Sequence, residues 1–441
     1  MSVPVRQRLS ARAATAVLAA GTVNRLSRLL GRGNGTVIGG RTGLAVDPGL
    51  LATLATGRRV ALVSGTNGKT TTTGMLVRAL DDGSAVATNR TGANMPAGHV
   101  AALIGDRDAA TAVLEVDEGY LGQVTGATRP RVVVLLNLSR DQLDRIAEVR
   151  MLAERWRTAL GGLPPGREGD APTVVVANAD DPMVAWAATD APGVRWVGAG
   201  QVWQHDAVGC PACGGRIGFD DDGGWRCDSC DFARPERSAW LEGHDLVLAD
   251  GRRYPLEIGL PGQFNRANAA MVAVAASAMP PLPGRPPVEV GTALERLSTL
   301  EEVAGRFSTV RRHGRDVRLL LAKNPAGWTA IFDLLDESDH RSPVVLSVNA
   351  RVADGHDPSW LWDVPFERLA RRTVVATGER CRDLAVRLRY AEVDHRTVED
   401  PLAALDAAAD GPGDGAGPDG PVPPVEFLGN YTAFATLRSR L

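Results

Sequence analysis

Short apolar runs alternate with helix-length segments from about residue 60 onward. The runs "RVALVSG", "TAVLEVDE", "RVVVLLNLS" and "PTVVVANADD" are rich in Val and Leu. This rhythm is typical of parallel strands that are buried on both faces of an α/β sheet. After a proline-rich link, "PPLPGRPP", the rhythm returns in "DVRLLLA", "SPVVLSVNA" and "RTVVATG". The pattern therefore predicts a central α/β domain followed by a smaller one.

The composition narrows the class of protein. A chain of 441 residues is long enough for two or three domains. Its 44% hydrophobic and 23% charged residues are ordinary for a soluble globular protein. A net charge of −3 gives no overall basic field, so nucleic acid is not an expected partner. No run of 18 uncharged apolar residues predicts a membrane span.

The first segment, residues 1–50, is expected to be helical. Its sequence "VRQRLSARAATAVLAAGTVNRLSRLLGRG" places arginines on both sides of an alanine-rich stretch. This arrangement predicts a basic amphipathic helix. Two interpretations stay open: the helix packs on the body of the protein, which we favour, or it touches an anionic membrane surface.

The stretch "VALVSGTNGKTTTTGMLVRAL" runs from a strand through a tight loop into a helix. Backbone N–H groups in such a loop and at the helix start attract phosphate. Lys69 would add a full charge at the β- and γ-phosphates, and the Thr70 hydroxyl would bind Mg²⁺. Val63 replaces the first glycine of GxxxxGK[ST], and a turn without nucleotide is the alternative. The predicted ATP-binding residues here are Gly65, Thr66, Asn67, Gly68, Lys69, Thr70 and Thr71.

Four of the five cysteines form two CxxC pairs. The pairs are separated by 13 residues, and their members are Cys210, Cys213, Cys227 and Cys230. Four thiolates at this kind of spacing form a closed tetrahedral Zn²⁺ site with no open position for water. We therefore expect a structural zinc ribbon in a reducing compartment, with a redox dithiol as the alternative.

The order of the motifs resembles the Mur ligase superfamily. In that resemblance "LEVDEGYL" supplies Glu115 as a second Mg²⁺ ligand, and "LPGQFNRANAAMVAVAA" places Asn265 and Asn268 near the adenine. Arg306 of "GRF" and Lys323 of "LLAKNP" become the candidate positive groups at the phosphates. Lys323 stands where the family has a histidine, and "NLSRDQLDR" has a glutamine where the family has another. Roughly 50 residues precede the first strand, too few for the UDP-binding domain of ordinary members.

These features together predict a fold and domain bounds. A Mur ligase-type central P-loop ATPase domain is expected over residues 51–305, with a four-cysteine zinc ribbon inserted at about 203–235. A smaller Rossmann-like α/β domain is expected over residues 306–441, with a low-complexity segment, "DGPGDGAGPDGPVPP", before its last strand.

A second unusual stretch is "NARVADGHDPSWLWDVPFERL". It crowds ionisable side chains beside two tryptophans: Asp354, His356, Asp357, Asp363, Trp360 and Trp362. Taken alone, tryptophans in a core and carboxylates that cap a helix explain it. The pattern DGxDxSWLWD, however, resembles the MurT family, whose members are the ligase-like subunits of MurT–GatD complexes.

The MurT resemblance implies a reaction and a partner. Members amidate the α-carboxyl group of D-Glu in the stem peptide of lipid II to D-isoglutamine, using ATP and Mg²⁺. The amidation passes through an acyl phosphate, and the ammonia comes from the glutaminase GatD. One carboxylate, Asp354 or Asp357, would complete the Cys–His pair of GatD, whereas Asp363 would be structural. The lipid substrate implies a cytoplasmic enzyme at the inner membrane face.

This chain shows no glutaminase of its own. Cys381 lies in the helical context "TGERCRDLAVRL", without a nucleophile elbow, and is expected to be a buried helix cysteine. Two alternatives to the amidating subunit stay open. One is a self-sufficient Mur-type or folylpolyglutamate-type ligase that adds an amino acid, and the other is a non-catalytic nucleotide-binding scaffold.

Overall fold

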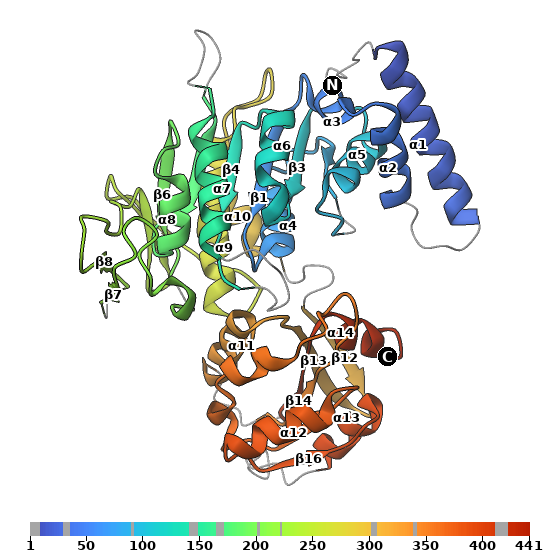
Figure 1. The fold of residues 1–441 in the computed structure, drawn as a ribbon, viewed down its shortest axis with the longest axis vertical. Coiled ribbons are helices and arrows are strands. Elements are labelled where there is room, and N and C mark those ends of the chain that lie inside the picture. The colour runs from blue at the N-terminus through green and yellow to red at the C-terminus, as the bar shows by residue number, and fades with distance from the viewer. Residues whose placement is uncertain are drawn as a thin grey trace. The chain divides into compact units, whose positions relative to one another are not determined.

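The computed structural model describes residues 9–29, 36–89, 92–140, 149–164, 172–200, 203–220, 223–300, 307–337, 342–410 and 422–441. They divide into two compact units. The first is built mainly from residues before 300 and the second mainly from residues after 306. Each unit has its own sheet (Figure 1).

The first unit contains a nine-stranded sheet in the order β11-β10-β9-β6-β5-β4-β1-β3-β2. Neighbours from β9 to β2 run parallel, while β9, β10 and β11 form an antiparallel edge. The strands are β1 (Arg59–Ser64), β2 (Val86–Ala87), β3 (Thr111–Glu115), β4 (Val132–Leu135), β5 (Val174–Asn178), β6 (Val194–Gly198), β9 (Ala239–Glu242), β10 (Asp245–Leu248) and β11 (Arg253–Pro255).

Helices accompany this sheet along the first unit. They are α1 (Ala11–Leu29), α2 (Thr36–Val46), α3 (Leu50–Ala55), α4 (Lys69–Ala79), α5 (Pro96–Gly105), α6 (Leu121–Thr128), α7 (Val149–Gly161), α8 (Pro182–Ala188), α9 (Gln263–Ala278) and α10 (Val290–Ser298), with the short 3-10 helices η1 (Glu118–Tyr120) and η2 (His205–Ala207).

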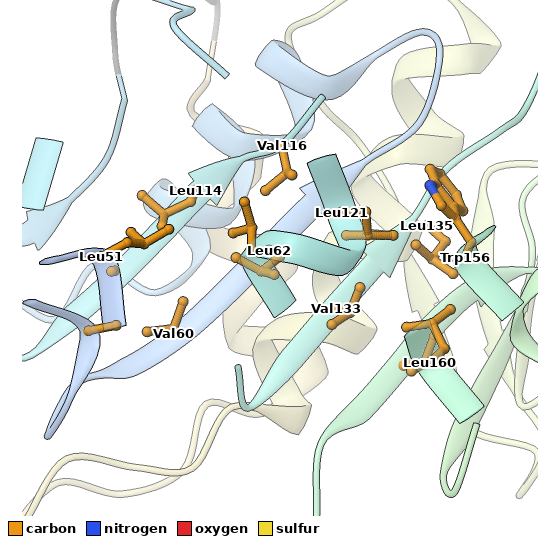
Figure 2. Packing of buried hydrophobic residues seen from close by; sticks show 14 of the residues in the cluster. Leu51, Val60, Leu62, Leu114, Val116, Leu121, Val133, Leu135, Trp156 and Leu160 are labelled. Carbon is orange, nitrogen blue, oxygen red and sulfur yellow. The ribbon is translucent and has the colours of Figure 1, made fainter. Parts of the chain in front are cut away.

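Alternate strand residues supply the core on one face of the sheet. Val60 and Leu62 of β1 and Leu114 of β3 join Leu121 of α6 and Trp156 of α7 in one buried cluster (Figure 2). The intervening residues of β1 are also fully buried, on the face where α4 contacts β1 and β3. Burial on both faces explains why these strands read as continuous apolar runs.

The N-terminal helices pack through small residues. Ala13, Ala16 and Ala20 of α1 are fully buried, and α1 contacts α2. A Cβ atom on Gly40 of α2 would lie 1.9 Å from the carbonyl oxygen of Ala97 in α5, so only glycine permits this approach. The helix pair is thereby held against α5. Contact with a membrane surface stays a prediction.

The cysteine-rich insertion follows β6. It forms a two-stranded antiparallel sheet of β7 (Ile217–Phe219) and β8 (Trp225–Cys227). Its small apolar cluster joins Ile217 and Trp225 to Ala185 of α8, with Trp196 of β6 and Phe232 packed against them. The insertion therefore shares its core with the main sheet domain.

The second unit contains a six-stranded sheet in the order β12-β13-β17-β14-β15-β16. Only the β12–β13 pair is antiparallel within this sheet. Its elements are β12 (Phe307–Arg312), β13 (Arg315–Leu321), α11 (Pro325–Glu337), β14 (Val344–Ser347), η3 (Ser359–Asp363), η4 (Phe366–Leu369), β15 (Val374–Thr377), α12 (Cys381–Tyr390), β16 (His395–Thr397), α13 (Pro401–Ala409), β17 (Val425–Gly429) and α14 (Tyr431–Arg438).

Helices cover both faces of this second sheet. Residues of α11 and α12 form a buried cluster on one face, and residues of α13 and α14 form another with alternate strand residues. The predicted α/β class with a smaller second sheet is confirmed. Among the described residues, no helix is long and apolar enough to cross a membrane.

We expect Gly40→Ala to weaken the docking of α2 on α5. The new methyl group meets backbone atoms of Ala97, so we expect a loss of about 1–3 kcal/mol of unfolding free energy, typical of overpacking. Hydrogen–deuterium exchange over residues 37–46 should rise. Gly21→Ala in α1 is the matched control, because nothing lies within 4 Å of its Cβ position. Equal exchange in both variants would contradict this packing.

Candidate active site and metal centre

Two glycines shape the turn between β1 and α4. Gly65 has φ +149°, and a Cβ atom there would lie 2.9 Å from Cβ of Leu136. Gly68 has φ +83°, and its Cβ would lie 3.1 Å from the Nδ2 atom of Asn268. Side chains at either position would be strained or crowded. The loop therefore lies close against the end of β4 and against α9.

Asn137 fixes the loop from the end of β4. Its backbone carbonyl accepts from the N–H of Thr66 at 2.9 Å, and its Oδ1 accepts from the N–H of Asn67 at 2.8 Å. Its Nδ2 donates to the carbonyl of Asn67 at 3.1 Å. The sequence analysis missed this residue, although it is the first letter of the quoted "NLSRDQLDR".

Lys69 is buried and engaged within the loop. Its ammonium group donates to the carbonyl oxygens of Gly65 at 2.5 Å and Thr66 at 3.0 Å. It also donates to Oε2 of Glu118 at 2.9 Å, and the two side chains of this ion pair are 5% and 6% exposed. An ammonium group has three N–H donors. A phosphate that binds Lys69 must therefore replace one of these acceptors.

Glu115 ends β3 opposite Val63 of β1, which leads into residues 65–71, the phosphate loop. Asn89 brackets its backbone, accepting from its N–H and donating to its carbonyl, each at 2.9 Å. Asn94 donates to the carboxylate Oε1 at 3.3 Å. The carboxylate is thus held at the edge of the sheet where α4 begins with Lys69 and Thr70. Hard oxygen ligands of this kind suit Mg²⁺.

His99 of α5 supports the same residue. Its Nε2 lies 2.8 Å from the carbonyl oxygen of Glu115, so Nε2 carries the proton in this contact. Burial lowers the pKa of His99 to about 4, which keeps the ring neutral near pH 7. His99, Asn89 and Asn94 escaped the sequence analysis, and their only signal was the polar segment "TNRTGANMPAGH" between β2 and β3.

The remaining predicted nucleotide residues fall in three places. Asn265 and Asn268 are buried on α9, and Asn268 lies beside Gly68. Lys323 follows β13 in the second unit and is half-buried. Arg306 lies outside the described residues. The first unit therefore brings together residues 65–71, Glu115 and Asn268.

The four paired cysteines converge in space. Their sulfur atoms all lie within 4.8 Å of one another. Sγ of Cys210 lies 3.8 Å from that of Cys230, and Sγ of Cys213 lies 3.5 Å from that of Cys227. Zn–S bonds of about 2.3 Å in a tetrahedron require sulfur separations of about 3.8 Å. The cluster could therefore hold a metal ion, and its geometry fits zinc.

Backbone N–H groups stabilise negative charge on two of these sulfurs. Gly215 donates to Cys213 at 3.4 Å, and Ser229 donates to Cys227 at 3.3 Å. The bond from Ser229 is the largest influence on Cys227, whose pKa is lowered to about 7. Bound zinc would hold the lobe together, and a site of four cysteines leaves no position for water.

The two candidate carboxylates of the second unit have different surroundings. Asp354 is buried, and its carboxylate accepts from the backbone N–H of Thr432 at 2.9 Å and from the Thr432 hydroxyl. Asp357 is exposed and accepts from the N–H of Ser359 at 2.9 Å. That bond lowers the pKa of Asp357, so its carboxylate is charged at neutral pH. Of the two, Asp357 is the one that faces solvent.

The two tryptophans of this loop also differ in their exposure to solvent. Trp360 is buried 6.2 Å from the ring of Trp328, whereas Trp362 is 54% exposed and lies 5.3 Å from the ring of Tyr390. Asp363 ends η3 and is exposed. Trp360 thus anchors the loop in the core, and Trp362 leaves an aromatic surface beside it.

A cavity of about 470 Å³ lies at the carboxyl ends of β14 and β15. The segment that carries Asp354 and Asp357, residues 349–363, is called the aspartate loop. Asn349 and Arg351 at its start line the cavity together with Cys381. Cys381 is buried at the first residue of α12, and burial raises the pKa of its thiol. Cys381 is thus a buried cysteine at the start of a helix, as the sequence predicted.

Comparison with known proteins agrees with both units. Residues 63–207 match the Mur ligase middle domain, and residues 321–434 match the MurT ligase C-terminal domain. The chain is 28% identical to the lipid II isoglutaminyl synthase (glutamine-hydrolyzing) subunit MurT of Staphylococcus aureus, over 86% of this chain and 88% of that protein. The subunit of the same name from Streptococcus pneumoniae is also 28% identical, over 82% and 83%.

Solved structures agree on the fold. MurF from Acinetobacter baumannii superposes with a TM-score of 0.63, at 15% sequence identity, over 91% of this chain and 80% of that one. The predicted Mur ligase-type fold is therefore confirmed. The chain is thus similar to MurT subunits over most of its length, and it matches both a Mur ligase middle domain and a MurT ligase C-terminal domain.

Proposed function

We propose that this chain is the ATP-using subunit of a glutamine-hydrolysing lipid II isoglutaminyl synthase in peptidoglycan synthesis. The observation that carries the proposal is the alignment with MurT subunits over 86% of the chain, including the C-terminal match that spans the aspartate loop. The substrate group is the α-carboxyl of D-Glu in the stem peptide, and the product is D-isoglutamine.

The phosphate loop supports the first step. A carboxylate oxygen attacks the γ-phosphorus of ATP, ADP leaves, and an acyl phosphate forms. Residues 65–71 offer backbone N–H groups to the phosphates, and Lys69 neutralises charge on the transferred group. Thr70 and Glu115 would hold Mg²⁺, which would supply positive charge to the phosphates. Asn265 and Asn268 are proposed to lie along the adenine.

The second step joins nitrogen to the activated carbon. Ammonia attacks the acyl carbon, loses a proton, and phosphate leaves. Arg306 and Lys323 are the proposed cationic groups near this anionic intermediate. Because free NH₃ is scarce at neutral pH, we propose a GatD-type glutaminase as a separate partner subunit. The name shared by the relatives, which calls them subunits, supports a partner.

We propose that this chain contributes the carboxylate of Asp357 to the partner's active site. A carboxylate that orients a partner's histidine must be charged and accessible. Asp357 meets both conditions, whereas the carboxylate of Asp354 is buried against Thr432 at the start of α14. The structure thus favours one of two residues that the sequence left equal.

Reconstitution tests the proposed reaction. The purified chain, ATP, Mg²⁺, glutamine and lipid II are incubated with and without the candidate glutaminase, and muropeptides are analysed by mass spectrometry. We expect amidated product only when both polypeptides are present. Lys69→Ala should abolish product, because the transferred phosphate loses its buried cation. Addition of an amino-acid residue, or amidation by Lys69→Ala, would overturn the proposal.

Asp357→Asn separates ammonia production from ligation. We expect glutamine-dependent amidation to fall by about 10²- to 10⁴-fold, because the partner's histidine loses its orienting carboxylate. Amidation driven by ammonium chloride should stay at the wild-type rate. Asp354→Asn is the matched control: it removes a buried acceptor at the start of α14, so both activities should fall together with the melting temperature. If Asp357→Asn also lost its ammonium-driven amidation, this role would be refuted.

Glu118→Ala tests the exchange of anions at Lys69. Without nucleotide, the variant leaves a buried ammonium group without its carboxylate partner, so its unfolding free energy should fall by about 3–5 kcal/mol. A bound triphosphate would restore an anionic partner. We therefore expect a non-hydrolysable ATP analogue with Mg²⁺ to stabilise Glu118→Ala more than wild type, as measured by urea unfolding. Glu118→Gln, which keeps an acceptor oxygen, should lose less. Equal stabilisation by nucleotide would argue against the exchange.

A further inference from the structure

The cysteine-rich insertion contacts the main domain at the turn after β5. Trp225 lies two residues before the zinc-ligand candidate Cys227 on β8 and is 2% exposed. Its indole N–H donates to the carbonyl oxygen of Ala179 at 3.0 Å. One residue farther along the turn, Asp180 lies 3.4 Å from the guanidinium of Arg234, which follows the second cysteine pair. The insertion thus makes two polar contacts with the turn "NADDP", residues 178–182.

The same turn is tied to the segment after β4. Asp181 is fully buried, and its Oδ2 accepts from the backbone N–H of Leu138 at 2.9 Å. Its Oδ1 accepts from the N–H groups of Met183 at 2.9 Å and Val184 at 3.1 Å, which caps α8. One carboxylate therefore joins the start of α8 to the end of the neighbouring strand β4.

The residue before Leu138 is Asn137, which makes three hydrogen bonds to the phosphate loop. A continuous series of contacts therefore runs from β8 to Ala179, through Asp181 to Leu138, and through Asn137 to Thr66 and Asn67. Every member belongs to the first unit. Buried and partly buried hydrogen bonds of this kind restrain the backbone segments that they join, because each lost partner leaves an unsatisfied polar group.

We propose that the cysteine-rich insertion is a positioning element of the nucleotide site, so that zinc at its four cysteines and nucleotide at residues 65–71 bind with positive coupling. The positioning residues are Trp225, Asp181 and Asn137. The inference rests on the proposed function in one respect, that the loop holds a nucleotide. Linkage makes the coupling reciprocal: zinc strengthens nucleotide binding by the same factor by which nucleotide strengthens zinc binding.

Trp225→Phe tests the first contact, because it keeps an aromatic ring in the cluster and removes the indole N–H. We expect the zinc-loaded, full-length variant to bind a non-hydrolysable ATP analogue about three- to tenfold more weakly by calorimetry, the range of one buried hydrogen bond. Trp203→Phe is the matched control. It also loses an indole hydrogen bond, at 2.7 Å to Asp206, but this bond stays within the insertion. We expect its nucleotide affinity to equal that of wild type.

A second measurement needs no variant. The zinc affinity of the wild-type chain is determined by equilibrium competition with a chelator, with and without saturating ATP analogue. We expect the analogue to tighten zinc binding several-fold. An unchanged zinc affinity, or Trp225→Phe with wild-type nucleotide affinity, would overturn the coupling while the proposed reaction stands. A wild-type chain that binds no analogue would overturn both.

Discussion

The phosphate loop is organised by a buried ammonium group that must never be left without acceptors. Moving an unpaired charge out of water costs several kcal/mol in a protein interior. Lys69 meets this constraint with two carbonyl oxygens of its own loop and with the carboxylate of Glu118. The loop is therefore closed around its lysine before any phosphate arrives. Binding of phosphate becomes an exchange of one anion for another, which explains why an acidic side chain stands inside a predicted anion site.

Three other polar side chains of the first unit lie where they do because of the sheet. Strands that are buried on both faces leave only their carboxyl edge for chemistry, and neighbouring strands end together there. Glu115 ends β3, while Asn137 and Asp181 follow β4 and β5 at that edge, and each bonds to a neighbouring segment. Asp181 binds the N–H of Leu138, the residue after Asn137, so a change at the end of β5 can reach the end of β4 and, through Asn137, the phosphate loop.

Much of this architecture could be predicted from the sequence, because it depends on local patterns. Apolar runs marked the strands, the glycines and Lys69 marked the loop, and cysteine spacing marked the metal cluster. The pairing of Lys69 with Glu118 could not be predicted. Asp117 and Glu118 are adjacent acidic residues, and only the turn of η1 directs Asp117 toward the N–H of Gly119 and Glu118 inward. Asn137 was missed because its contact depends on β4 lying beside β1, an order that hydrophobicity does not encode.

The aspartate loop of the second unit shows the same limit and leads to a functional distinction. Asp354 and Asp357 are three residues apart in one motif, so spacing cannot separate them. The difference arises from α14, some 78 residues later, whose first turn takes the carboxylate of Asp354 as its acceptor. That contact fixes the loop, while Asp357 is exposed and accepts a hydrogen bond from Ser359, two residues farther along. An orienting carboxylate has to be rigid in its backbone and open at its oxygens. The buried contact of Asp354 supplies the first property and the exposure of Asp357 the second, which is why Asp357 is the residue proposed for this role.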